Sequence, residues 1–250
     1  MLDTLPTLST TDWIWLMVSG MLIGGAKAGL RGLGMLAIPI MAAIFGGKPS
    51  AGLVLPMLII ADTLAVLYYN RDAEWSYIWK LLPAAVIGIL TGSVVGLYIN
   101  DDTFKIFMGS IVIAGLILMV VQERRALPAT LTQSYGFGAA FGLLGGFSTM
   151  IGNAAGPVMA VYLLAIHLPK NTFIGTGAWF FLLINVIKVP LHVLVWKTIY
   201  WESLKISLLT APAIILGIGI GIAVIKVIPE REFRYFIIIV TFLTALRLFW

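Results

Sequence analysis

Long apolar segments follow one another along almost the whole chain and restrict it to one class of fold. They cover roughly residues 12–29, 33–46, 50–70, 76–99, 103–121, 134–151, 154–168, 172–196, 203–228 and 232–249. A membrane-spanning helix needs about 20 such residues, and 60% of the 250 residues are hydrophobic against 11% charged. A transmembrane β-barrel would instead alternate apolar and polar residues. The sequence therefore predicts an all-α polytopic membrane protein.

Several functions are excluded by what the chain lacks. It has no cysteine, and its two histidines, His167 and His192, have no carboxylate at ligand spacing, so no metal and no other cofactor is expected. No phosphate-binding loop is present, which argues against ATP hydrolysis by this chain. The net charge of +5 is typical of membrane orientation and lipid head-group contact, not of a nucleic-acid partner. The first 11 residues carry no basic residue, unlike the start of a cleavable signal peptide.

A glycine and proline pattern recurs on both sides of the polar linker 122–133. Several glycines and prolines of the first half have a residue of the same type 118 positions later, and others have one 129 positions later. The first set pairs Gly20, Gly24, Gly34 and Pro39 with Gly138, Gly142, Gly152 and Pro157, and the second pairs Pro83, Gly88 and Gly92 with Pro212, Gly217 and Gly221. The pattern predicts two homologous halves, 1–121 and 134–250, that form one integrated membrane domain.

Each half is expected to open with a glycine-broken segment, followed by three transmembrane helices. If the broken segments fold back as re-entrant hairpins, the basic residues divide unequally between the two faces, as the positive-inside rule favours. The smaller group is then Lys48, Lys105, Lys197, Lys205 and Arg247. This model makes the halves inverted repeats and places both termini outside. A model in which each broken segment simply crosses the membrane remains the alternative.

The first break carries two cations, Lys27 and Arg31, between Gly24 and Gly34. Ionisable residues inside a membrane are costly and mark functional sites by default. An ammonium and a guanidinium four residues apart share a helix face and suit an anionic ligand. The sequence therefore predicts an anion site at Lys27, Arg31 and Gly34. The alternative is that both cations extend to lipid head groups.

The second break adds neutral hydrogen-bond donors from the other half. Ser148, Thr149, Gly152 and Asn153 are the candidate substrate-binding residues there. Short helices are expected to begin at about Leu36 and Ala154, with Asn153 capping the second, so that two helix N-termini point at an anion. The alternative for the hydroxyl groups is hydrogen bonding to carbonyls of their own helix.

Four further polar residues are candidates for coupling or gating. They are Asp62, within segment 50–70, and Asn185, Lys188 and His192, on one side of segment 172–196. Asp62 and Lys188 are expected to pair across the halves, with Asp62 or His192 taking up a proton. A static buried pair that holds the halves together is the alternative.

With these features the chain resembles the TauE/SafE family of sulfite and organosulfonate exporters, also called TSUP. The resemblance rests on the length, on two related halves that each open with a glycine-rich stretch and a proline (Gly24 to Pro39; Gly142 to Pro157), and on the charged linker between them. It implies a multi-pass protein of the bacterial inner membrane that transports small sulfur-containing anions such as sulfite, thiosulfate, sulfoacetate or other organosulfonates. Lys27 and Arg31 suit that substrate class.

The function expected from the sequence is secondary transport, by alternating access around an anion site at the membrane midplane and with proton coupling. An anion channel and a carrier of other anions, such as carboxylates, are the nearer alternatives. A structural subunit and an intramembrane enzyme are more distant alternatives. An enzyme would need a nucleophile beside a base, and the sequence offers Ser148 with His192 far along the chain.

Overall fold

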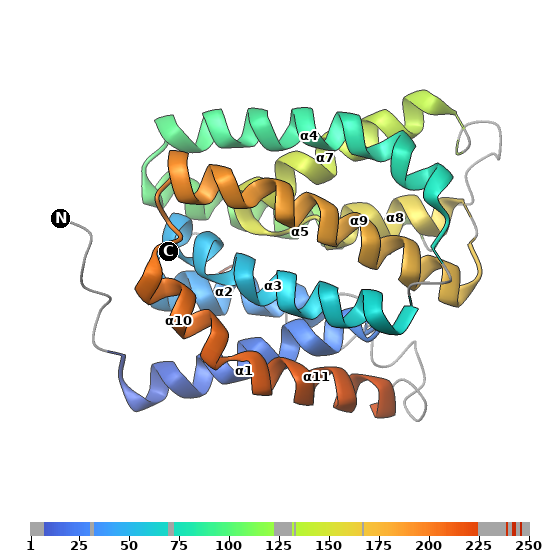
Figure 1. The fold of residues 1–250 in the computed structure, drawn as a ribbon. Helices are drawn as coiled ribbons and strands as arrows, with labels where there is room; N and C mark the ends of the chain where they lie inside the picture. Colours follow the sequence, from blue (N-terminus) through green and yellow to red (C-terminus); the bar gives the residue numbers. More distant parts are fainter. Residues whose placement is uncertain are drawn as a thin grey trace.

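A computed structural model gives the architecture of the chain (Figure 1). It describes residues 8–30, 33–69, 73–122, 132, 134–166, 168–224, 239, 242, 243 and 246. Every regular element in these residues is a helix, which confirms the all-α prediction. Four of the helices are long and apolar enough to cross a membrane, and they cover Gly47–Tyr68, Trp75–Tyr98, Thr172–Val195 and Trp201–Ala223.

The described helices form two series along the chain. The first series is α1 (Thr10–Lys27), α2 (Leu33–Phe45), α3 (Gly47–Tyr69), α4 (Trp75–Tyr98) and α5 (Asp101–Gln122). The second is α7 (Tyr135–Gly152), α8 (Gly156–Ala165), α9 (Lys170–Pro190) with its π-helical extension η2 (Leu191–Val195), α10 (Trp201–Leu209) and α11 (Ala211–Val224). α10 and α11 together form one membrane-length span, Trp201–Ala223, in the place of α4, and the segment expected to match α5 lies almost wholly outside the described residues. Both series open with a broken segment, as the sequence predicts. The order agrees with two related halves.

The ends of α1 and α7 align the two halves differently from the glycine pattern. α1 and α7 both have 18 residues, and their ends differ by 125 positions, from Thr10 to Tyr135 and from Lys27 to Gly152. The glycine and proline matches use 118. Glycine is so frequent in both segments that its matches alone do not fix the register. When α1 and α7 are aligned by their ends, Lys27 is equivalent to Gly152, which precedes Asn153.

Two details of the breaks differ from the predictions. The short helices begin at Leu33 and Gly156 rather than at Leu36 and Ala154, so Pro39 lies inside α2. Asn153 does not cap the start of α8; it closes α7 in the left-handed conformation, with φ of 55°. Asparagine tolerates this conformation better than most residues, which suits it to a helix C-terminus.

The two series run in opposite directions through the molecule. α3 and α9 pack against each other antiparallel, since Asp62 contacts Asn185 near their middle while Gly52, near the start of α3, lies against Thr198 beyond the end of η2. Glu74 and Thr176 meet at the opposite end. α1 and α2 pack against each other as an antiparallel hairpin, and α3 runs parallel to α1 (Figure 1). This arrangement is the one expected of inverted halves with hairpin first segments.

Glycines let two helix pairs approach closely, and each pair joins the two series. At the interface of α1 with α11, a Cβ at Gly24 would overlap the carbonyl oxygen of Ile214. At the interface of α4 with α7, a Cβ at Gly146 would overlap that of Ala85. Small residues at such crossings are typical of membrane helices. Gly24 therefore allows α1 to pack on α11. The helical conformation ends further along the chain, after Lys27, and Gly29 has a positive φ of 110°.

The buried apolar residues form two main cores, one around each of these helix pairs. The α1–α11 core contains Leu16, Ile23, Ala37, Met41, Leu53, Val54, Met57, Ala61, Ile206 and Ile214. The α4–α7 core draws on α4, α5, α7, α8 and α9, with Met35, Ile38, Ala42, Ala51 and Trp196. The cores are thus built from both series, and the facing sides of α3 and α9 run between them (Figure 1).

Two glycines of α11 give a test of the close packing. Gly217→Ala is expected to destabilise the protein by about 1–3 kcal/mol, because its Cβ would overlap the carbonyl oxygen of Met21. Gly219→Ala is the matched control, since nothing lies within 4 Å of its added Cβ and alanine suits a helix better. Thermal unfolding of the detergent-solubilised variants measures the difference. Equal unfolding temperatures would contradict the packing role.

Candidate anion site

An ion pair joins the end of α1 to the middle of α3. Lys27 is the last residue of α1, and its Nζ lies 2.7 Å from Oδ1 of Asp62. The Asp62 side chain is fully buried, whereas 14% of the Lys27 side chain is exposed. The Lys27 ammonium also lies 4.0 Å from the ring centre of Phe181 in α9, a favourable cation–π distance. Lys27 therefore points inward to a buried carboxylate rather than outward to lipid head groups.

The second oxygen of Asp62 connects the two halves. Its Oδ2 accepts a hydrogen bond of 2.7 Å from Nδ2 of Asn185, a buried residue of α9. The carboxylate thus receives a cation from one side and an amide donor from the other. A buried charge needs such partners, since leaving it unpaired costs several kcal/mol.

Lys188, one turn beyond Asn185, binds the residues of the second break, between α7 and α8. Its Nζ donates to Thr149 O at 3.0 Å, to Thr149 Oγ1 at 2.8 Å and to Asn153 Oδ1 at 2.7 Å. Asn153 in turn donates from Nδ2 to the carbonyl of Ala51 in α3, at 3.0 Å. Lys188 has no exposed surface, and all three acceptors are neutral. The Lys188 amine is therefore buried at the C-terminal end of α7, beside the free carbonyls of that helix end.

The predicted pairing of Asp62 with Lys188 is not the contact that forms. Lys27 forms the ion pair with Asp62, and Lys188 instead donates hydrogen bonds to residues at the end of α7. The two cations and one carboxylate form a polar seam, which we define as Lys27, Asp62, Asn185, Lys188, Thr149 and Asn153. Of the described residues, this set carries one more positive than negative charge when all three groups are ionised, and an anion would balance it.

His192 lies in η2, beyond the end of α9, and its contacts are separate from those of the polar seam. Its Nδ1 is 2.8 Å from Thr198 Oγ1, and its ring centre is 5.0 Å from that of Trp196. The indole N–H of Trp196 donates to the carbonyl of Ser93 at 3.0 Å. His192 is fully buried, and its Nε2 has no partner among the described residues.

The remaining predicted site residues either make contacts within the protein or lie outside the described residues. Ser148 donates from Oγ to Leu144 O of its own helix at 2.6 Å, which is the alternative considered for it. Gly34 faces Ala26 across the first break, and Gly152 packs against Met108. Arg31 falls outside the described residues. The described part of the chain contains no cluster of His, Asp or Glu able to hold a metal ion.

Two partners of the predicted residues, Phe181 and Thr198, were not predicted from the sequence. Phe181 precedes Asn185 by four positions and shares its helix face with Lys188 and His192, so helical spacing could have identified it. Thr198 follows η2 and carries no comparable sequence signal.

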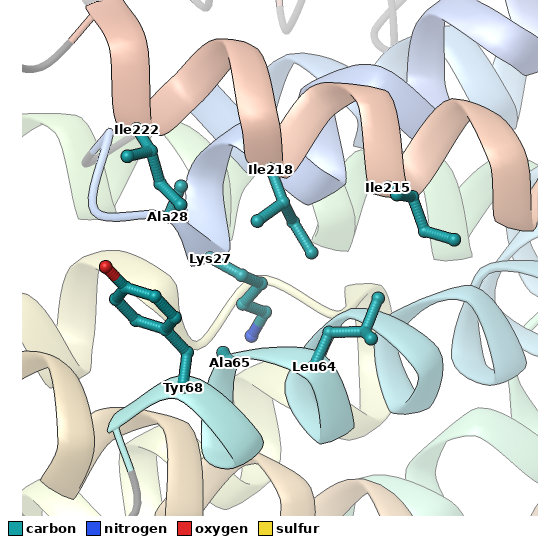
Figure 2. Close-up of a pocket in the computed structure, with 8 residues that line it drawn as sticks. All are labelled: Lys27, Ala28, Leu64, Ala65, Tyr68, Ile215, Ile218 and Ile222. Carbon is teal, nitrogen blue, oxygen red and sulfur yellow. The ribbon is translucent and has the colours of Figure 1, made fainter.

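A small cavity opens beside Lys27, between α3 and α11 (Figure 2). Its volume is about 160 Å³. Apart from Lys27 and Ala28, its lining comes from two helices: Leu64, Ala65 and Tyr68 of α3, and Ile215, Ile218 and Ile222 of α11. The Lys27 side chain extends across the cavity from α1 toward α3, while the isoleucines line the opposite wall (Figure 2).

A double-substitution cycle tests the ion pair. Lys27→Met alone leaves Asp62 buried without its cation and is expected to cost about 3–5 kcal/mol of stability. The double variant Lys27→Met with Asp62→Asn removes both charges and should recover most of that loss. Thermal unfolding of the purified variants gives the coupling. Strictly additive losses would show that the two groups do not interact.

The chain was compared with known proteins. The model of the family described as "Sulfite exporter TauE/SafE" matches residues 16–248, which is nearly the whole chain. No curated protein matches it. The family is one of transporters rather than enzymes, and together with the four long apolar helices the match makes this a multi-pass membrane protein. The chain therefore belongs to the sulfite exporter TauE/SafE family.

Proposed function

We propose that this protein is a proton-coupled secondary transporter, in a bacterial inner membrane, that exports small sulfur-containing anions through the polar seam. One observation carries the proposal: both breaks, at Lys27 and at Asn153, bring polar groups to the facing sides of α3 and α9. Paired broken helices that meet at a central site are typical of secondary transporters. The two lysines of the seam suit sulfite, thiosulfate or a sulfonate, since an amine can donate hydrogen bonds to the oxygens of such an anion.

Alternating access then follows the two cores rather than the two halves. The α1–α11 and α4–α7 pairs are each packed backbone to backbone, so each pair would move as a unit. The seam lies where the cores meet, and its contacts are hydrogen bonds and the Lys27–Asp62 ion pair, which can be exchanged for contacts with an anion. Movement of the α4–α7 core against the α1–α11 core would expose the seam to each side in turn.

Removal of the Lys27 charge should weaken anion binding. Lys27→Ala is expected to lose about 1–3 kcal/mol of binding free energy for sulfite and sulfonates, as the loss of a charge-assisted hydrogen bond would give. Calorimetry on the purified protein measures the effect, with gel filtration as a check of folding. Lys205→Ala, which removes an exposed cation of α10, is the control and should bind normally. Normal binding by Lys27→Ala would reject the site.

Substitution of Asp62 should separate binding from proton coupling. Asp62→Asn keeps the size and shape of the side chain and one acceptor oxygen, but it cannot gain or lose a proton. Transport should therefore no longer respond to an imposed pH gradient while anion binding stays measurable. Uptake into proteoliposomes gives the readout, with the exposed Asp102→Asn as control. A pH response like that of the unsubstituted protein would exclude Asp62 as the proton carrier.

The channel and the carboxylate carrier remain the competing functions. Saturable exchange of internal for external anion in proteoliposomes is expected of a carrier and not of a channel. Sulfite, thiosulfate and sulfoacetate should each outcompete dicarboxylates in the same assay. The reverse order of competition would assign the seam to carboxylates.

A further inference from the structure

We propose that the cavity beside Lys27 binds the apolar substituent of a small organic anion, whose acidic group replaces the Asp62 carboxylate on the Lys27 ammonium. The inference rests on the proposed function and narrows its substrate class to sulfonates or other acids that carry a short hydrocarbon group. Inorganic anions such as sulfite would bind the same Lys27 ammonium but would make no apolar contact with the cavity wall.

The lining of the cavity argues for an amphiphilic ligand. Ile215, Ile218 and Ile222 form one wall along α11, and Leu64 and Ala65 of α3 face them (Figure 2). An anion surrounded by water gains nothing from such a wall, whereas a hydrocarbon group gains about fourfold in affinity for each methylene that it buries. A volume of about 160 Å³ is well below the roughly 300–1,000 Å³ of sites for drug-sized ligands. The cavity therefore has room for a hydrocarbon group of a few carbon atoms.

The position of Lys27 allows an exchange of partners. Its ammonium is reached from the cavity, while Asp62 approaches it from α3 and is fully buried. An ammonium has three donors, and Asp62 is the carboxylate that it contacts in the described part of the chain. A ligand anion can thus approach through the cavity without first crossing the seam.

Proton uptake by Asp62 completes the exchange. If the ligand anion takes over Lys27, a charged Asp62 would keep only the Asn185 amide as a partner, which is costly for a buried carboxylate. Addition of one proton to Asp62 converts the carboxylate to the neutral acid, and the ligand anion then balances the Lys27 charge. One anion and one proton enter the site together, and the net charge of the seam does not change.

A homologous series of ligands tests the inference on the full-length purified protein. The probes are methanesulfonate, propanesulfonate and butanesulfonate, with sulfite as the inorganic member and butyltrimethylammonium as a cation with the same tail. Affinity by calorimetry is expected to rise about fourfold per methylene, which is about 60-fold from methanesulfonate to butanesulfonate, and the cation should not bind. Equal affinity along the series, or binding of the cation, would overturn the inference.

Variants of the cavity wall locate the effect. Leu64→Phe fills the cavity and should remove the rise of sulfonate affinity with chain length. Ile222→Ala shortens the wall and should weaken butanesulfonate by roughly fivefold to tenfold. Ile220→Ala, on the same helix but outside the cavity, is the matched control. A loss in Ile220→Ala equal to that in Ile222→Ala would overturn the assignment.

Two further outcomes are distinguishable. If neither sulfite nor any sulfonate binds, the proposed function fails; if sulfite is transported but the series is flat, only the cavity assignment fails. An anionic lipid shares the chemistry of the probe, so the series is repeated with added phosphatidylglycerol. An unchanged series supports a soluble ligand. Stabilisation by the lipid that Leu64→Phe removes would assign the cavity to lipid and overturn the inference.

Discussion

The Asp62 carboxylate is the buried charge on which the centre of this structure depends. Without exposed surface, it exists as a charge only because Lys27 and Asn185 bind its two oxygens. The cation comes from the broken end of α1 and the amide from the middle of α9, so the contact ties together segments that are distant in sequence. Such a pair contributes little net stability compared with an apolar contact, but its disruption is costly. It favours one arrangement of these helices and is also a contact that a ligand anion can replace.

Tightly packed glycine interfaces surround this exchangeable centre. The glycines at α1–α11 and α4–α7 bring backbones together with no flexible side chains between them, which favours rigid pairs. The polar seam between the cores is held instead by directional contacts among a few side chains. The division between rigid pairs and an exchangeable seam is the physical basis for transport around a central site, and it places the moving boundary along α3 and α9 rather than at the linker between the halves.

The membrane class, the two broken segments and most of the seam were predictable because each leaves a local signal. An apolar run of about 20 residues identifies a helix, and an ionisable residue such as Lys27, Asp62 or Lys188 stands out within it. The partners of these residues were not predictable. Lys188 was expected beside Asp62, yet it binds Thr149 and Asn153, because helix rotation and depth decide which cation reaches the carboxylate. The role of Gly24 in packing on α11 likewise depends on a contact with a helix near the other end of the chain.

The sequence by itself determined that the chain is a helical membrane protein with intramembrane charges near paired glycine-broken segments, since hydropathy, glycine content and charge are properties of the residues alone. Only the tertiary structure decided that Asn153 closes α7 instead of opening α8, that Lys27 is held by Asp62, and that an apolar cavity adjoins its ammonium. These features depend on distances between side chains from α1, α3, α9 and α11, which residue spacing along any one helix does not specify.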